Sequence, residues 1–298
     1  MNSTTRGYEE IIQRFCQWAE NQPEVRAAMV IGSQARRERP ADEWSDLDLV
    51  VVTTEPDALM TDTEWLKNLG NLLLTFVETN PAGSPERRVM FEGGLDVDIV
   101  PLRPQAISHL QAGVEAKAAE AVELANLIGR GTRILFDLDG ALNQFVESIT
   151  SLPVPEASTR LPAEQEFLNL VNDFWYHAVW VAKHLRRGEL WWAKGGCDGH
   201  LKGLLHSMLV WQARAAGRDT WFRGRFLEDW AEPRAVKELG GTFAHYDRED
   251  VWRALFETMH LFERVSLETA TRLGFTYPIS GMITARMLVY QFYAGRGD

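Results

Sequence analysis

A strand that breaks at a glycine–serine turn, followed by a second strand headed by two aspartates, constrains this chain more than any other feature. Residues 25–31 form an apolar run that stops at Gly32 and Ser33, which predicts a buried strand ending in a turn. Asp46 and Asp48 stand at the start of a second apolar run, rich in valine, that continues to residue 52. Because positions i and i+2 of a strand project from the same face, both carboxylates point at one spot.

Two carboxylates held this close repel each other unless a cation lies between them or one takes up a proton. Oxygen-only ligands favour Mg²⁺, which keeps several waters and accepts substrate phosphates as further ligands. Gly32 allows the backbone to approach a phosphate, and the hydroxyl and N–H of Ser33 can bind phosphate oxygens. We therefore predict a metal–nucleotide site and a nucleotidyltransferase. The alternative is a solvated strand edge, since Asp-x-Asp alone is a common pattern.

A third strand, predicted over residues 95–100 after the hairpin signal Gly93-Gly94, carries Asp96 and Asp98. A sheet that brings this strand beside the first aspartate pair creates a cluster of three carboxylates. Such a cluster suits a two-metal transfer, in which one ion activates an acceptor hydroxyl and the other holds the triphosphate. The third carboxylate can also accept the hydroxyl proton. Asp96 and Asp98 share a face, so geometry alone does not choose between them.

Length and charge bound the organisation and the partners of the chain. Its 298 residues suggest two domains, 1–150 and 151–298, with a linker over residues 150–162 that contains three prolines. The formal charge of −11, from 31 basic and 42 acidic residues, argues against a nucleic-acid partner and suits a cationic small-molecule substrate. The chain has no apolar stretch of membrane-spanning length, no signal peptide and only two cysteines, so we expect no membrane partner and a cytoplasmic location.

The two halves differ in their pattern. The first mixes strands with flanking helices, whereas the second shows helical periodicity throughout, so we predict an α+β protein with a mixed β-sheet domain and a C-terminal all-α bundle. The expected helices of the bundle span residues 166–187, 197–216, 221–230, 233–239, 248–273 and 283–293. Residues 133–140 resemble the Asp-x-Asp-Gly motif of haloacid-dehalogenase-type hydrolases, but the helices that follow favour a short strand or turn closing the first domain.

Further short motifs recur in one order along the chain and resemble those of the aminoglycoside 6-adenylyltransferases, the streptomycin-modifying enzymes of the DNA-polymerase-β-like nucleotidyltransferase superfamily. The matching motifs, besides the turn and the aspartate pair, are Trp65-Leu66 with Leu69-Gly70, Leu95-Asp96 ending in Val100-Pro101, Asn172-Asp173-Phe174-Trp175, Ala182-Lys183, Glu189-Leu190, and Val251-Trp252 with Ala254-Leu255-Phe256. They extend from about residue 25 to about residue 290.

The resemblance implies transfer of AMP from ATP to a hydroxyl of streptomycin, with pyrophosphate leaving. It implies that Asp46 and Asp48 bind Mg²⁺, and the spacing to Pro101 favours Asp96 over Asp98 as third metal ligand and general base. The family commonly has arginine directly after Gly-Ser, where this chain has Gln34, so the triphosphate contact is lost or moves to Arg36.

The resemblance also assigns candidate binding residues to the helical half. Lys183 and Lys202 stand where the family places basic groups toward the nucleotide, and Arg225 lies in a similar basic segment. The alternative for each is a solvated helix face. Asp173 and Trp175 can meet the guanidinium groups of streptomycin, although core packing explains Trp175 equally well.

Two other functions fit the same pattern. One is adenylylation of a different small molecule or a protein, and the other is a nucleotide-binding module that has lost catalysis. The sequence leaves open the acceptor hydroxyl, the choice between ATP and GTP, and the oligomeric state. Four histidines of the helical half, His177, His184, His200 and His206, show no zinc-type pair with a carboxylate companion, so we expect them to be structural or surface groups.

Overall fold

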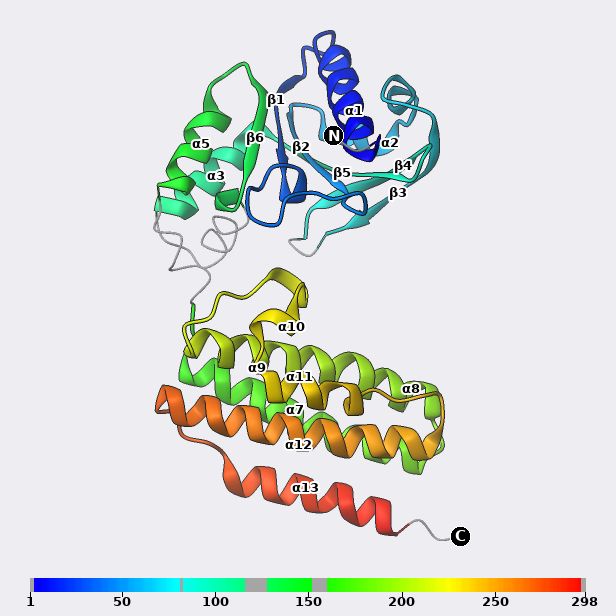
Figure 1. Cartoon of the computed structure of the whole chain (residues 1–298), viewed down its shortest axis with the longest axis vertical. Coiled ribbons are helices and arrows are strands. Elements are labelled where there is room, and N and C mark those ends of the chain that lie inside the picture. The colour runs from blue at the N-terminus through cyan, green and yellow to red at the C-terminus, as the bar shows by residue number, and fades with distance from the viewer. Residues whose placement is uncertain (1–2, 81–82, 116–127, 152–159, 296–298) are drawn as a thin grey trace. The chain divides into compact units, whose positions relative to one another are not determined.

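The computed structural model describes residues 3–80, 83–115, 128–151 and 160–295, which fall into two compact units, Met1–Ala157 and Ser158–Asp298. The proline-rich linker predicted over residues 150–162 falls largely on positions 152–159, outside the described residues. Figure 1 shows a β-sheet with helices in the first unit and helices alone in the second. The predicted α+β class with an all-α second half is thereby confirmed.

The first unit is built on a six-stranded mixed sheet with the strand order β3-β4-β5-β2-β1-β6. Only β2 and β5 pair in parallel, and the other neighbours are antiparallel. The strands span Val25–Ile31 (β1), Leu47–Thr53 (β2), Leu72–Thr79 (β3), Pro85–Phe91 (β4), Leu95–Leu102 (β5) and Thr132–Asp137 (β6). The segment that resembles the hydrolase motif is thus β6, an edge strand that pairs with β1, as the prediction of a short closing strand requires.

Side chains alternate along the central strands and feed two separate cores. On one face, Val30 and Leu49 pack with Phe15 of α1 (Ser3–Ala19). On the other, Met29 and Val50 pack with the helices α3 (Pro104–Glu115) and α5 (Ala141–Thr150). Both faces of β1 and β2 are therefore covered, which explains why these two strands are apolar almost throughout. The short helices α2 (Pro56–Thr61), η1 (Gly32–Gln34) and η2 (Glu64–Asn68) connect the strands.

The second unit packs long helices around an aromatic core. Its longest helices are α7 (Glu164–Arg186), α9 (Leu201–Ala215), α12 (Arg248–Leu273) and α13 (Ile279–Ala294). Shorter segments are α8 (Leu190–Gly195), the π-helical turn η3 (Gly196–His200), η4 (Phe222–Gly224), α10 (Leu227–Trp230), α11 (Pro233–Leu239) and η5 (Gly240–Thr242). Phe174 of α7 stacks on Phe262 of α12 with ring centroids 3.6 Å apart. No helix among the described residues is long and apolar enough to cross a membrane.

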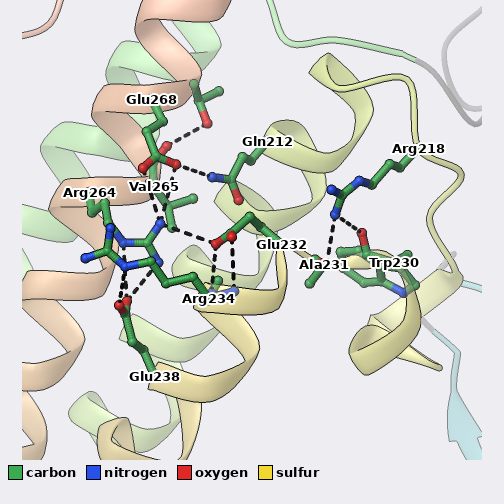
Figure 2. Close-up of polar contacts among 12 residues, drawn as sticks. Gln212, Arg218, Trp230, Ala231, Glu232, Arg234, Glu238, Arg264, Val265 and Glu268 are labelled. Carbon is green, nitrogen blue, oxygen red and sulfur yellow. Dashed lines mark hydrogen bonds and ion pairs between the residues drawn. The ribbon is translucent and has the colours of Figure 1, made fainter.

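A network of charged and polar side chains links α9, α11 and α12 (Figure 2). Arg264 of α12 is 15% exposed and contacts Glu238 at 2.8 Å, Glu268 at 3.3 Å and Glu232 at 3.5 Å. The Nε2 of Gln212 in α9 donates to the Oε2 of Glu268 at 2.6 Å. One shielded guanidinium therefore balances carboxylates from two helices.

Candidate active site

The parallel pairing of β2 with β5 brings acidic side chains of two segments together. Asp48 is the direct ladder partner of Asp98, and Leu47 is the partner of Val97. One carboxylate oxygen from each of Asp46, Asp48 and Asp98 lies within 4.8 Å of the others. The three carboxylates therefore cluster where the start of β2 lies beside the middle of β5. A donor set of oxygens alone, with this spacing, fits a hard divalent cation such as Mg²⁺.

The glycine–serine turn closes against this cluster. Gly32 has φ of +72°, and a Cβ at this position would lie 2.1 Å from the Oδ2 of Asp48. Only glycine allows both the left-handed backbone and the close approach of the carboxylate. Ser33 is buried, and its Oγ donates to the backbone carbonyl of Asp46 at 3.3 Å. The turn that the sequence predicts as a phosphate cradle is thus in direct contact with the aspartate pair.

Asp98 is the most enclosed member of the cluster, with 6% of the residue exposed. Arg88 of β4 pairs with the Oδ2 of Asp98 through Nη1 and also contacts Glu78 at 2.8 Å and Glu86 at 3.2 Å. Burial raises the pKa of Asp98 to about 6, and the nearby charges of Glu86 and Asp46 add to the rise, while Arg88 opposes it. A carboxyl group tuned in this way can exchange a proton near neutral pH.

Arg88 is a site residue that our sequence analysis missed. The signal was available, because β4 and β5 form a hairpin around Gly93-Gly94 in which Phe91 pairs with Leu95 and Arg88 pairs with Asp98. Counting backward from the glycines along an antiparallel hairpin would have placed the guanidinium opposite the carboxylate.

Asp96, which the proline spacing favoured, lies outside the group of three. Its ladder partner on β4 is Met90, its side chain is exposed, and its backbone N–H donates to the hydroxyl of Tyr8 at 3.1 Å. The register that sets residue 98 opposite residue 48 decides this outcome, because Asp96 stands two positions nearer the exposed end of β5. The structure thus brings Asp98, and not Asp96, together with Asp46 and Asp48.

Two of the residues predicted to contact the nucleotide already form hydrogen bonds within their own units. The Nε of Arg36 donates to the carbonyl of Arg39 at 2.5 Å. Lys202 is largely buried in the helical unit, where its Nζ donates to Thr258 Oγ1 at 2.8 Å and to the carbonyl of Cys197 at 3.0 Å. Burial lowers the pKa of Lys202, as expected for an amine that serves packing inside a bundle.

The other two basic candidates are exposed. Lys183 lines a cavity of about 570 Å³ between α7 and α13. Arg225 follows η4 in a segment where Arg223 and Phe226 have φ of +54° and +55°. Left-handed backbone at residues other than glycine costs roughly 1–3 kcal/mol each and is enriched at active sites and ligand-binding segments.

Asp173 and Trp175, the two candidate substrate-binding residues, do not face the same site. Trp175 is 4% exposed, and its indole N–H donates to the hydroxyl of Tyr277 at 3.2 Å. Asp173 is partly exposed, and its Oδ1 lies 2.5 Å from His177 Nδ1 and 2.9 Å from His200 Nε2. Residues two apart on an α-helix differ by about 200° in direction, so Asp173 and Trp175 occupy different faces of α7.

This geometry corrects the expectation for the histidines. Asp173 and His177 are four residues apart on α7, and the π-helical turn brings His200 to the same carboxylate. The sequence did not indicate this group, because His200 comes from a different segment whose approach to α7 depends on tertiary packing.

Comparison with known proteins agrees with the resemblance found in the sequence. A model of the family described as Streptomycin adenylyltransferase matches residues 5–287. The chain belongs to this family. Among its relatives, the aminoglycoside 6-adenylyltransferase of Bacillus subtilis (strain 168) is 23% identical over 286 residues, covering 92% of this chain and 93% of that protein. The aminoglycoside 6-adenylyltransferase of Campylobacter jejuni is 21% identical over 287 residues, covering 92% of both chains.

Among solved structures, the chain is similar to an aminoglycoside 6-adenyltransferase from Bacillus subtilis. The two share 17% sequence identity with a TM-score of 0.46, over 99% of this chain and 100% of the other.

Proposed function

We propose that this streptomycin adenylyltransferase family member transfers AMP from ATP to a hydroxyl group of streptomycin and releases pyrophosphate, in the cytoplasm and with Mg²⁺. The convergence of three carboxylates beside a glycine–serine turn is the observation that carries the proposal. The family match and the names of the relatives favour an aminoglycoside as acceptor. The chain's charge of −11 also suits a cationic substrate.

In the proposed reaction, the acceptor oxygen forms a bond to the α-phosphorus while the bond from that phosphorus to pyrophosphate breaks. Asp46, Asp48 and Asp98 would hold Mg²⁺, which when bound neutralises the triphosphate and makes the acceptor hydroxyl more acidic. Asp98 accepts the hydroxyl proton, consistent with the raised pKa of its carboxyl group. Backbone N–H groups at Gly32 and Ser33 hold phosphate oxygens. Asp96 stays the alternative third carboxylate, because it projects from the same face of β5.

Arg36, Lys183 and Arg225 are the basic groups that we propose as nucleotide contacts. The unfavourable backbone on both sides of Arg225 supports a binding role for this residue. Lys183 is the only charged side chain among the described residues that line the α7–α13 cavity, so this cavity favours an anionic ligand over a cationic one. Arg36 can serve if it leaves the carbonyl of Arg39. Lys202 is not proposed as a nucleotide contact, because its hydrogen bonds to Thr258 and Cys197 would have to break.

Of the two residues proposed to contact streptomycin, Asp173 is better placed to do so than Trp175. Its partly exposed carboxylate can meet a guanidinium group, whereas Trp175 is buried and shares a cavity with Lys183. If Asp173 contacts streptomycin, Asp173→Asn should raise the KM for streptomycin and leave the KM for ATP unchanged. Equal KM values for streptomycin in the two proteins would remove Asp173 from the binding site.

The proposal is tested by incubating the protein with Mg²⁺, a nucleotide and a panel of aminoglycosides, and measuring pyrophosphate release. We expect release with ATP and streptomycin, less with GTP, and none in a matched Asp46→Asn/Asp48→Asn variant. Pyrophosphate release only with a different small molecule or a protein as acceptor would favour adenylylation of that acceptor. ATP binding without pyrophosphate release for any acceptor would indicate a nucleotide-binding module that has lost catalysis.

A further inference from the structure

A second group of metal-binding side chains lies in the helical unit. The group comprises Asp173 and His177 on α7 and His200 at the end of the π-helical turn η3. Both imidazoles direct a ring nitrogen at the same carboxylate oxygen, Asp173 Oδ1, at 2.5 Å and 2.9 Å. The two rings lie side by side with centroids 4.1 Å apart. His177 Nδ1 also lies 3.1 Å from the backbone carbonyl of Asp173. Three donor atoms from two segments therefore lie within 4.8 Å of one another.

The chemistry of this group differs from that of the aspartate cluster in the first unit. Two imidazole nitrogens and one carboxylate oxygen form a ligand set typical of Zn²⁺, with the fourth position left for water or a ligand, whereas Mg²⁺ prefers oxygen alone. In a tetrahedral site with bonds of about 2.0–2.1 Å, ligand atoms stand roughly 3.3 Å apart. The two separations from Asp173 Oδ1, 2.5 Å and 2.9 Å, need to widen by less than about 1 Å, which side-chain rotation provides.

The backbone around the group holds two of the ligands on a rigid element. A neighbouring face of α7 is buried through Phe174, Ala178 and Val181, so the helix has little freedom to move. Asp173 and His177 are one helical turn apart and lie on one face of α7. His200 comes from a π-helical turn, an irregularity that is common at functional sites. All three side chains are partly exposed, so an ion can reach them from solvent.

We propose that Asp173, His177 and His200 bind a divalent transition-metal ion, with Zn²⁺ as the probe. A bound ion would link α7 to the π-helical turn and offer one open coordination position to a ligand. The proposal does not rest on AMP transfer, because it concerns other residues than the aspartate cluster and is tested by metal binding alone.

The experiment titrates the tag-free, chelator-treated full chain with Zn²⁺ by calorimetry, in excess Mg²⁺ so that the aspartate cluster does not compete. Co²⁺ serves in parallel, because its visible absorption reports nitrogen ligation. We expect one Zn²⁺ per chain, and a loss of affinity of about tenfold or more in His177→Gln and in His200→Gln. His245→Gln is the matched control, since His245 contacts a single carboxylate, Asp250, at 2.9 Å and is not part of a three-ligand group among the described residues.

Unchanged Zn²⁺ affinity in both His177→Gln and His200→Gln, or no binding to the wild-type chain, would overturn the proposal. Because both side chains are partly exposed, the variants are expected to keep the wild-type melting temperature without metal, and circular dichroism checks this. The same pair of variants separates the two roles considered for Asp173. The metal site requires His177 and His200, whereas a direct contact between Asp173 and streptomycin does not.

Discussion

Asp48 and Asp98 lie directly opposite each other on the two parallel strands of an otherwise antiparallel sheet. This pairing places their carboxylates, with that of Asp46, within 4.8 Å of one another. Arg88 on the next strand reaches Asp98 and shares its charge with two glutamates. The candidate site is therefore a consequence of sheet topology.

The aspartate cluster predicts which acidic side chains control turnover. Asp48→Asn and Asp98→Asn should each lower kcat for AMP transfer by about a hundredfold or more, since catalysis of this kind depends on charge and positioning. Asp96→Asn is the matched control on the same strand and should retain most of the activity. A strong loss in Asp96→Asn together with near-normal turnover in Asp98→Asn would reverse the assignment of the third carboxylate.

Gly32 is predicted to be irreplaceable for both stability and activity. In Gly32→Ala the new Cβ meets the Oδ2 of Asp48 at 2.1 Å, in addition to the strain of φ +72°. Gly94 has nearly the same φ, +73°, but nothing lies within 4 Å of an added Cβ. Urea unfolding should show a loss of about 1 kcal/mol for Gly94→Ala and at least about 2 kcal/mol for Gly32→Ala, which should also lose turnover. Equal losses would mean that the carboxylate moves aside at no cost.

The raised pKa of Asp98 predicts a pH dependence of stability in metal-free buffer. The folded chain binds the Asp98 proton up to about pH 6, whereas the ordinary value of the group is 3.8. The native state therefore holds more protons than the unfolded state between these values, so the free energy of unfolding falls as pH rises from about 4 to about 6. At pH 7 the charge on the buried Asp98 carboxylate lowers the free energy of unfolding by up to ~3 kcal/mol.

Asp98→Asn should remove this fall, so that between pH 4.5 and pH 7, in the presence of a chelator, the free energy of unfolding changes less in the variant than in the wild type. Urea unfolding at pH 4.5, 5.5 and 7 measures the effect. Asp139→Asn serves as control, because the Arg26 guanidinium lowers the pKa of Asp139 and its titration lies below this range. The idea fails if Asp98→Asn and the wild type lose stability equally over this range.

In the helical unit, the shielded position of Arg264 predicts a large loss of stability on its removal (Figure 2). Arg264→Ala leaves Glu232, Glu238 and Glu268 without their shared guanidinium and should cost about 2–4 kcal/mol in urea unfolding. Arg234→Ala is the matched comparison, because this side chain is 66% exposed and pairs with Glu238 at 2.9 Å. Arg234→Ala should lower the free energy of unfolding by no more than about 1 kcal/mol. Similar losses in the two variants would contradict a special role for Arg264.

The fold class and the first aspartate pair were predictable because they depend on local patterns. Strand and helix periodicity separates the two halves, and the i, i+2 spacing alone puts Asp46 and Asp48 on one face. The choice between Asp96 and Asp98 was not predictable in this way, because it depends on the register of β5 against β2, two strands that are distant in sequence.

Dependence on tertiary packing also explains where the helical unit differs from the sequence-based expectation. Periodicity does not reveal a π-helical turn, so the helix expected over residues 197–216 divides into η3 and α9. That division determines where His200 points and hides its partnership with Asp173. Lys202 resembles a solvated basic residue in the sequence, but tertiary packing encloses it against Thr258.

Anomalous diffraction from crystals grown with Mn²⁺ and a non-hydrolysable ATP analogue tests the central claim most directly, because Mn²⁺ takes the oxygen ligands of Mg²⁺. The account predicts anomalous peaks at bonding distance from carboxylate oxygens of Asp46, Asp48 and Asp98, with the triphosphate against the Gly32–Ser33 turn. A nucleotide bound elsewhere, with no metal peak at these aspartates, would contradict it.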